Sequence, residues 1–202
     1  SETLSRIFSQ RFKKLGGKIL FEEIYLQDTD NFHSYLKKIK LLQPSVLFVP
    51  GHIIDSARII KQARDIGIKI PILGGDGWSN SMYELAGSAL NGNYYSVHWH
   101  KDSRNTKNRL FVKKYQKEMG KIERNGPALA YDTVSLYADA VHRAGSFNPS
   151  KVREALAATK SFKGVTGDIT FNKNGDPIKS AVILRFDNGT SVYAKTINPQ
   201  GD

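Results

Sequence analysis

Two short apolar runs organise the first half of the chain, residues 46–49 and residues 70–73, and neither alternates apolar with polar positions. Each run is soon followed by glycine, at Gly51 and at Gly74. Unbroken apolar runs of this length are typical of parallel strands buried on both faces. Residues 53–66 between the runs carry apolar side chains at helical spacing. The pattern therefore predicts a βαβ unit with two adjacent parallel strands.

The residues before this unit also alternate helix and strand. Apolar positions predict a helix over residues 4–15, ended by the glycine pair 16–17. A strand is expected over residues 18–25, followed by a loop at 28–30 that caps a helix over 31–42. Because a doubly wound lobe normally begins on a strand, this order predicts that at least one strand before the first helix is missing.

Beyond the second apolar run, a short helix over 79–87 and a strand over 93–99 are predicted before the pattern changes. Helices dominate the next stretch, and the longest of them carries Ala130, Val134, Tyr137 and Val141 on one face. The chain then returns to strands, which we expect to be antiparallel because turn residues separate them. The predicted elements are helices at 106–119, 127–144 and 149–158, the last with an Asn148 cap, and strands at 167–171, 180–186 and 190–196.

This order divides the chain into three regions: residues 1–99 form an α/β lobe, residues 100–163 form helices, and residues 164–202 form strands that return to the hinge and to the lobe of residues 1–99. The predicted class is α/β, a parallel sheet flanked by helices with C-terminal antiparallel strands. A chain that leaves one lobe and comes back suits a protein that closes around its ligand.

The net charge and the absence of cysteine bear on which partners and which chemistry to expect. Thirty Lys and Arg residues against nineteen Asp and Glu give a net charge of +11, which raises the question of nucleic acid. The charges are spread along helices at solvent-facing positions, so we expect no nucleic-acid partner; an anionic membrane surface or an acidic membrane partner is the alternative. Without cysteine the chain has no disulfides and no thiolate chemistry, which fits a cytoplasmic or a bacterial exported protein.

Polar residues follow the two apolar runs where a ligand should bind, outside the carboxyl ends of parallel strands. Asp76, in a Gly-Gly-Asp-Gly turn, can accept a charge-assisted hydrogen bond from a ligand ammonium, or it can stabilise the turn or cap the next helix. His52 can donate to a ligand or stack on it, or it can be an ordinary loop residue. Gly51 and Gly75 allow close approach of the backbone, and Trp78 either walls the cleft or packs beneath the short helix.

The sequence gives little support for a metal site, a nucleotide-binding site or an enzyme active site. His98 and His100 share a face of the predicted strand, but no third ligand is indicated, so we expect no metal. Asn172–Asp176 resembles a calcium loop without its downstream acidic ligand and is better explained as a hairpin turn. The sequence contains no phosphate-binding glycine loop, dinucleotide fingerprint or nucleophile elbow. We therefore expect a binding protein without a cofactor, not an enzyme.

Several segments, taken together and in order, resemble the periplasmic leucine/isoleucine/valine-binding protein family, the type I solute-binding proteins of amino-acid ABC transporters. The similarity runs through residues 32–44, 46–51, 62–67, 72–78, 130–132 and 162–171, with Gly175 and Asp176. It implies a truncated type I periplasmic binding protein fold, in which residues 1–99 are the second lobe without its first strand and residues 100–163 are helices of the first lobe.

The resemblance also assigns roles. It places Asp76 at the position that binds the α-ammonium of an amino acid, and His52 at a position that is often aromatic and touches the ligand. Tyr131 falls in an Ala-Tyr-Asp element, where packing is the alternative to ligand contact. Ser1 corresponds to the residue just after an aromatic that often lines the cleft. Asn125 and Gly126 stand where the family often has another aromatic wall, which leaves the ligand type open.

The implied function is that of a periplasmic or extracellular binding protein, with a lipoprotein anchor possible, that presents an amino-acid-like ligand to a membrane permease. A ligand-sensing domain of a receptor or regulator with the same fold is the alternative. Because a sheet without its neighbour strand leaves unpaired backbone groups, we also expect a homodimer or a strand-exchanged oligomer.

Overall fold

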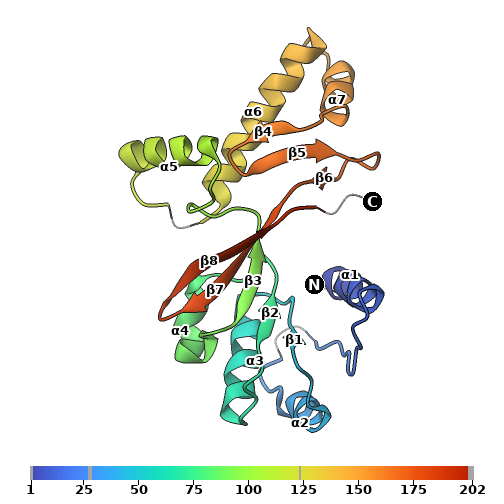
Figure 1. Ribbon diagram of the computed structural model, residues 1–202, viewed down its shortest axis with the longest axis vertical. Coiled ribbons are helices and arrows are strands. Elements are labelled where there is room, and N and C mark those ends of the chain that lie inside the picture. Colours follow the sequence, from blue (N-terminus) through green and yellow to red (C-terminus); the bar gives the residue numbers. More distant parts are fainter. Residues whose placement is uncertain (1, 27–28, 123, 200–202) are drawn as a thin grey trace. The chain divides into compact units, whose positions relative to one another are not determined.

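The computed structural model describes residues 2–26, 29–122 and 124–199, and the chain divides into two compact units (Figure 1). Unit 1 comprises residues 1–96 and 184–192, and unit 2 comprises residues 97–183 and 193–202. The predicted loop residue 28 and the predicted cleft residue Ser1 lie outside the described residues. The assignment of residues 1–99, 100–163 and 164–202 to family lobes stays a prediction.

Unit 1 contains the predicted βαβ unit. Its helices are α1 (Glu2–Lys14), α2 (His33–Leu42), α3 (Ile53–Asp65) and α4 (Tyr83–Ala86), with 3-10 turns η1 (Asn80–Met82) and η2 (Gly87–Leu90) on either side of α4. Its sheet contains β1 (Leu47–Phe48), β2 (Ile72–Gly74) and β3 (Tyr94–Val97), followed by β7 (Ala181–Asp187) and β8 (Thr190–Ile197), in the order β1-β2-β3-β7-β8. Residues 184–192 are the part of β7 and β8 that belongs to unit 1. The strands β1, β2 and β3 are parallel, as the unbroken apolar runs predict.

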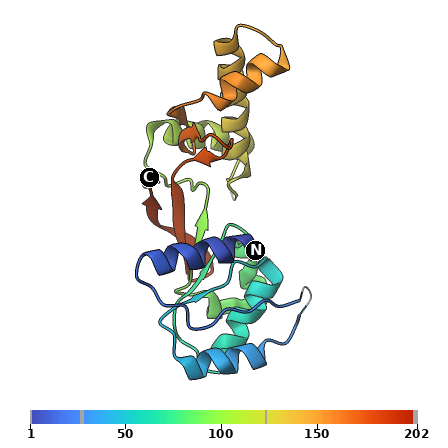
Figure 2. The same cartoon turned by 90° about the vertical axis from the view of Figure 1, so that its right-hand side faces the viewer.

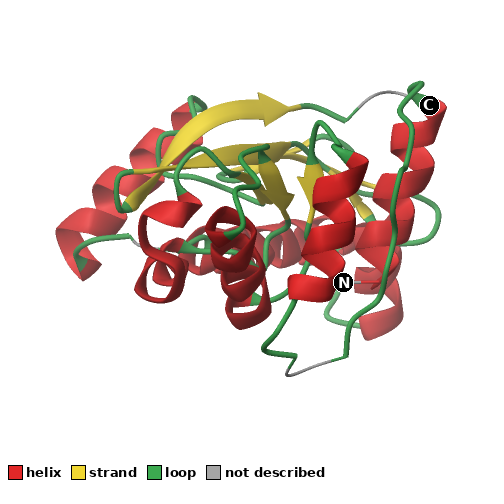
Figure 3. Cartoon of the chain, turned by 90° about the horizontal axis from the view of Figure 1, so that it is seen from below, coloured by secondary structure: helices red, strands yellow, loops and turns green. Residues whose placement is uncertain are grey.

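The prediction of a strand over residues 18–25 is wrong. These residues contain no strand, and in Figure 3 the segment that leads from α1 into the grey trace is drawn as loop. A strand needs a neighbour for its backbone hydrogen bonds, and β1 is the last strand of the sheet on this side. For the same reason Leu47 and Phe48 are only half-buried, although the sequence predicts burial on both faces.

A buried amide fixes the middle of unit 1. The side chain of Asn93 is fully buried, and its Oδ1 accepts hydrogen bonds from the backbone N–H of Ile72 at 3.0 Å and from Nη2 of Arg64 at 2.7 Å. Its Nδ2 donates to the carbonyl of Leu90 at 2.9 Å. One residue therefore ties β2 to α3 and to the turn before β3.

Unit 2 combines helices with a small sheet. The helices are α5 (Thr106–Met119), α6 (Gly126–Ala144) and α7 (Pro149–Ala157), and the sheet has the order β4 (Phe162–Gly164), β5 (Gly167–Phe171), β6 (Pro177–Ile178), with antiparallel pairs. The Asn148 cap is confirmed, because its Oδ1 accepts from the N–H groups of Ser150 and Lys151. The turn at Asn172–Asp176 is confirmed as a β5–β6 hairpin, whereas β4 and β6 are too short to be recognised from the sequence.

The apolar face predicted on α6 is not its buried face. The helix buries Ala128, Asp132, Leu136 and Ala140, whereas Val134 is 69% exposed and Tyr137 is 53% exposed. Sequence reasoning missed the buried face because, apart from Leu136, its residues are alanines and an aspartate. Asp132 can be buried because its carboxylate accepts hydrogen bonds from the N–H groups of Val165 and Thr166, at 2.6 and 2.7 Å.

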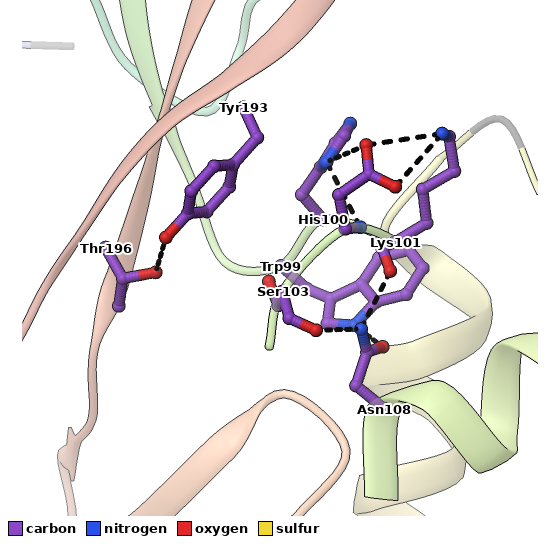
Figure 4. A network of polar contacts seen from close by, with 8 residues as sticks. Trp99, His100, Lys101, Ser103, Asn108, Tyr193 and Thr196 are labelled. Atoms are coloured by element: carbon purple, nitrogen blue, oxygen red, sulfur yellow. Dashed lines mark hydrogen bonds and ion pairs between the residues drawn. The ribbon is translucent and has the colours of Figure 1, made fainter. Parts of the chain in front are cut away.

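The segment that follows β3 is held by a second buried amide (Figure 4). The indole Nε1 of Trp99 donates to Oδ1 of Asn108 at 2.7 Å, and Nδ2 of Asn108 donates to the carbonyls of Lys101 and Ser103. His100 lies in the same segment, 3.5 Å from the carboxylate of Asp102. Burial lowers the pKa of His100, and the negative charge of Asp102 opposes that shift only in part.

Replacement of Asn93 by alanine should destabilise unit 1, because the N–H of Ile72 and the guanidinium of Arg64 would lose a buried acceptor. We expect the free energy of unfolding to fall by about 2–4 kcal/mol. Urea denaturation followed by circular dichroism measures the loss. Asn80→Ala, at an exposed position of the same unit, is the matched control; an equal effect of both substitutions would contradict this role of Asn93.

The stability of unit 2 should depend on pH through His100. The folded state holds a proton on His100 less readily than the unfolded chain does. The contribution of neutral His100 to the free energy of unfolding is therefore fully present above about pH 6.5 and is lost as the pH falls below it. Thermal unfolding at pH 7.5 and pH 5.5 should show a smaller acid-induced decrease for His100→Gln than for the unmodified protein. The exposed His142→Gln variant is the control, and an undiminished decrease in His100→Gln would disprove the assignment.

Candidate functional site

The two strand ends that the sequence singles out lie next to each other in unit 1. In the parallel β1–β2 pair, Leu47 is opposite Ile72 and Phe48 is opposite Leu73, and the N–H of Val49 donates to the carbonyl of Leu73 at 2.8 Å. This register brings Gly51–His52 and Gly75–Asp76 to the same edge of the sheet. A Cβ atom on Gly77 would lie 3.1 Å from the carbonyl oxygen of Gly51 and 3.7 Å from Nδ1 of His52, so the two turns are in contact.

His52 and Asp76 both expose their side chains. His52 occupies the N-cap position of α3 in an extended conformation, and its side chain makes no capping hydrogen bond. The N-cap position of η1 is occupied by Ser79. An exposed carboxylate beside an exposed imidazole can bind a small molecule that carries a cationic donor and an acceptor.

The glycines of the two turns lie close to side chains of the protein itself. A Cβ on Gly51 would overlap the hydroxyl of Tyr25 and lie 2.9 Å from Oγ of Ser56, and a Cβ on Gly75 would lie 2.9 Å from the side chain of Leu4. Gly51 and Gly75 are themselves buried. Their observed role is close backbone approach, while ligand contact at these two positions stays a prediction.

Trp78 belongs to the core and not to an open wall. Its side chain is 2% exposed and its ring lies 6.1 Å from that of Phe186 and 6.2 Å from that of Tyr95. The indole fills the space in which a side chain at Gly74 would stand. The packing alternative for Trp78 is therefore favoured.

Sequence reasoning overlooked Tyr25, since it was assigned to a strand. Its hydroxyl lies against Gly51, and its ring makes an edge contact with Phe32 at 5.2 Å. Burial raises the pKa of Tyr25, and the nearby charge of Asp55 raises it further. The hydroxyl thus stays protonated and can donate a hydrogen bond near the first turn. The signal available in the sequence was a tyrosine at the end of an apolar segment.

The remaining candidates belong to unit 2. Tyr131 lies on α6, is 53% exposed and has its ring 5.2 Å from that of Phe111. His98 and His100 follow β3 instead of lying on it. Across residues 2–26, 29–122 and 124–199 there is no group of three or more His, Cys, Asp or Glu side chains that could hold a metal ion. Within the same residues, every helix is too short or too polar to cross a bilayer.

Comparison with solved structures gives the fold. The crystal structure of a leucine-binding protein from Thermotoga maritima is 32% identical, with a TM-score of 0.87 over 97% of this chain and 56% of that protein. The branched-chain amino acid transporter substrate-binding protein of Streptococcus pneumoniae, solved with isoleucine, is 28% identical with a TM-score of 0.80 over 96% of this chain and 56% of that protein. The predicted fold class, a partial type I periplasmic binding protein fold, is confirmed.

Sequence comparison agrees. A Leu/Ile/Val-binding protein homologue of Brucella abortus is 29% identical over 177 residues, which are 87% of this chain and 47% of that protein. The leucine-, isoleucine-, valine-, threonine- and alanine-binding protein of Pseudomonas aeruginosa is 25% identical over 158 residues, 78% of this chain and 42% of that protein. The chain spans about half the length of these relatives. Since the profile of the periplasmic binding protein family matches residues 1–191, the chain belongs to that family.

Proposed function

We propose that residues 1–202 form part of an extracytoplasmic solute-binding protein of an ABC transporter, and that its ligand is a small amino-acid-like molecule. The observation that carries the proposal is the exposed pair His52 and Asp76 on two touching turns at the carboxyl ends of adjacent parallel strands. Family membership and the names of the relatives, which are binding proteins and not enzymes, support the same conclusion.

The chemistry of the site fits an amino acid. The Asp76 carboxylate would accept charge-assisted hydrogen bonds from the ligand ammonium, and such bonds are about twice as strong as neutral ones. His52 would contact the remainder of the ligand, either as a hydrogen-bond donor or through its ring. The backbone before both side chains is closely packed, because Tyr25 lies against Gly51 and Trp78 lies against Gly74.

The mechanism would be a shift between open and closed forms of a two-lobed protein. The ligand gains contacts with the second lobe only in the closed form, so it stabilises that form by its differential affinity. The closed form would then be presented to a membrane permease outside the cytoplasm. We propose no nucleic-acid partner and no cofactor.

Asp76→Asn should weaken ligand binding in a protein of the relatives' length that contains these residues. Loss of a charge-assisted hydrogen bond costs about 2–5 kcal/mol, so the dissociation constant for the preferred amino acid should rise about 30-fold or more. Isothermal titration calorimetry measures this change. Asp65→Asn, at the exposed far end of α3, is the matched control, and retained affinity in Asp76→Asn would remove Asp76 from the site.

The 202 residues by themselves should bind amino acids poorly, because only part of the enclosing surface is available to stabilise a closed form. Titration calorimetry with leucine, isoleucine and valine should therefore detect no tight binding. Intact secondary structure, checked by circular dichroism in the same buffer, is the control. A micromolar dissociation constant would show that the ligand needs no second lobe and would overturn the proposed mechanism.

A further inference from the structure

Four asparagines of the chain are each followed by glycine. In such a pair the backbone nitrogen of the glycine can attack Cγ of the asparagine side chain, because glycine has no Cβ to hinder the approach. The nitrogen loses its proton, the side-chain amide leaves as ammonia, and the succinimide ring that forms is opened by water to aspartate or isoaspartate. Asparagine is among the thermolabile residues of proteins. The four pairs are residues 91–92, 125–126, 174–175 and 188–189.

Two structural conditions control the rate of this reaction. The glycine nitrogen must be free to approach the side chain, so any hydrogen bond that its N–H donates has to be broken first. The peptide between the two residues must also rotate, so contacts that hold the asparagine or the surrounding turn slow the reaction. The four pairs differ in both respects.

The two pairs of unit 1 hold each other in place. The N–H of Gly92 donates to a backbone carbonyl of β7 at 2.9 Å. Oδ1 of Asn91 accepts from the Tyr83 hydroxyl at 2.8 Å and from the N–H of Asn188 at 3.1 Å. The Tyr83 hydroxyl in turn accepts a hydrogen bond from the N–H of Gly189. Both glycine nitrogens of unit 1 are therefore engaged.

The pair in the β5–β6 hairpin is held by the turn itself. The N–H of Gly175 donates to the carbonyl of Asn172 at 3.0 Å. Oδ1 of Asn172 accepts from the N–H groups of Asn174 and Asp176, both at 2.9 Å. Rotation of the peptide between Asn174 and Gly175 would disturb all of these bonds.

The pair at the start of α6 is held less firmly. Gly126 is the first residue of the helix, where N–H groups have no partner within the helix, and its N–H has no acceptor in the part of the chain that the structure describes. The side chain of Asn125 makes no capping hydrogen bond, and a Cβ on Gly126 would meet nothing within 4 Å. The carbonyl of Asn125 accepts from the N–H of Leu129 at 3.1 Å, a bond of the terminal helical turn.

The sequence also makes this first turn easy to open. Pro127 follows Gly126, and a residue before proline is disfavoured in the helical conformation. Glycine itself loses more conformational freedom on folding than any other residue. Figure 2, like Figure 1, shows α7 beside the last turns of α6 and away from its first turn. Local opening at Asn125 therefore costs little free energy.

We propose that Asn125 is a site of spontaneous deamidation, through a succinimide formed with the backbone nitrogen of Gly126. The reaction adds a negative charge at the N-cap position of α6. Aspartate caps a helix about as well as asparagine does, and its charge is favourable at a helix N-terminus, so this product preserves the start of α6. Isoaspartate lengthens the backbone by a methylene group, so that product displaces the cap.

Incubation of the 202-residue chain in mildly alkaline buffer tests the proposal. Digestion with pepsin in acid, which suppresses further succinimide formation, and mass spectrometry then measure the deamidated fraction at all four pairs. Asn125 should react about fivefold faster, or more, than each of the other three asparagines, because their glycine N–H groups must first lose a hydrogen bond. An equal or faster rate at any of the other three would overturn the proposal.

The same incubation in urea is the control for sequence effects. Since glycine follows the asparagine in every pair, the four rates should converge once the structure is lost. If Asn125 kept its lead in urea, the folded structure would not be the cause, and the proposal would fail.

Two variants test the cause at single positions, with circular dichroism as the check on folding. Gly126→Ala adds a methyl group where the structure has space, and it should slow deamidation of Asn125 several-fold. Tyr83→Phe removes the acceptor of the Gly189 N–H, so Asn188 should react faster while the rate at Asn125 stays unchanged. Unaltered rates at Asn125 in the first variant, or at Asn188 in the second, would contradict the proposed control by the glycine nitrogen.

Discussion

The backbone ladder between β1 and β2 is the interaction on which the candidate site depends. Two hydrogen bonds, from Leu47 to Pro71 and from Val49 to Leu73, fix the register of these strands. Since side chains alternate along a strand, a slip by one residue would turn every following side chain to the other face. This register therefore places the turn with His52 and the turn with Asp76 at the same edge of the sheet. The buried amide of Asn93 reinforces it by holding Ile72 from the other side.

Local signals made much of this fold predictable. Unbroken apolar runs identified β1 and β2, and capping residues such as Asn148 located helix starts, because these features act within a few residues of chain. Residues 18–25 show the limit of such reasoning. Their composition suits a strand, but a strand exists only when a neighbour accepts its hydrogen bonds, and that information is not local.

The same distinction explains the candidate site. His52 and Asp76 could be placed from the sequence, since the ends of adjacent parallel strands share an edge. Close backbone approach at Gly51 was predicted as well, but the group that requires it was not, because the Tyr25 hydroxyl comes from a segment 26 residues earlier in the chain. In unit 2, the burial of Asp132 could not be predicted for a similar reason. A carboxylate on the buried face of α6 makes sense only once the N–H groups of Val165 and Thr166 are known to lie opposite it.

The two tryptophans of the chain are divided between the units, Trp78 in unit 1 and Trp99 in unit 2. Both indoles are almost completely buried, the first among aromatic rings and the second against the amide of Asn108. Each unit therefore contains its own intrinsic fluorophore in a distinct environment. Variants that keep only one of them would report separately on the melting of each half, and so reveal whether the halves unfold in a single cooperative transition.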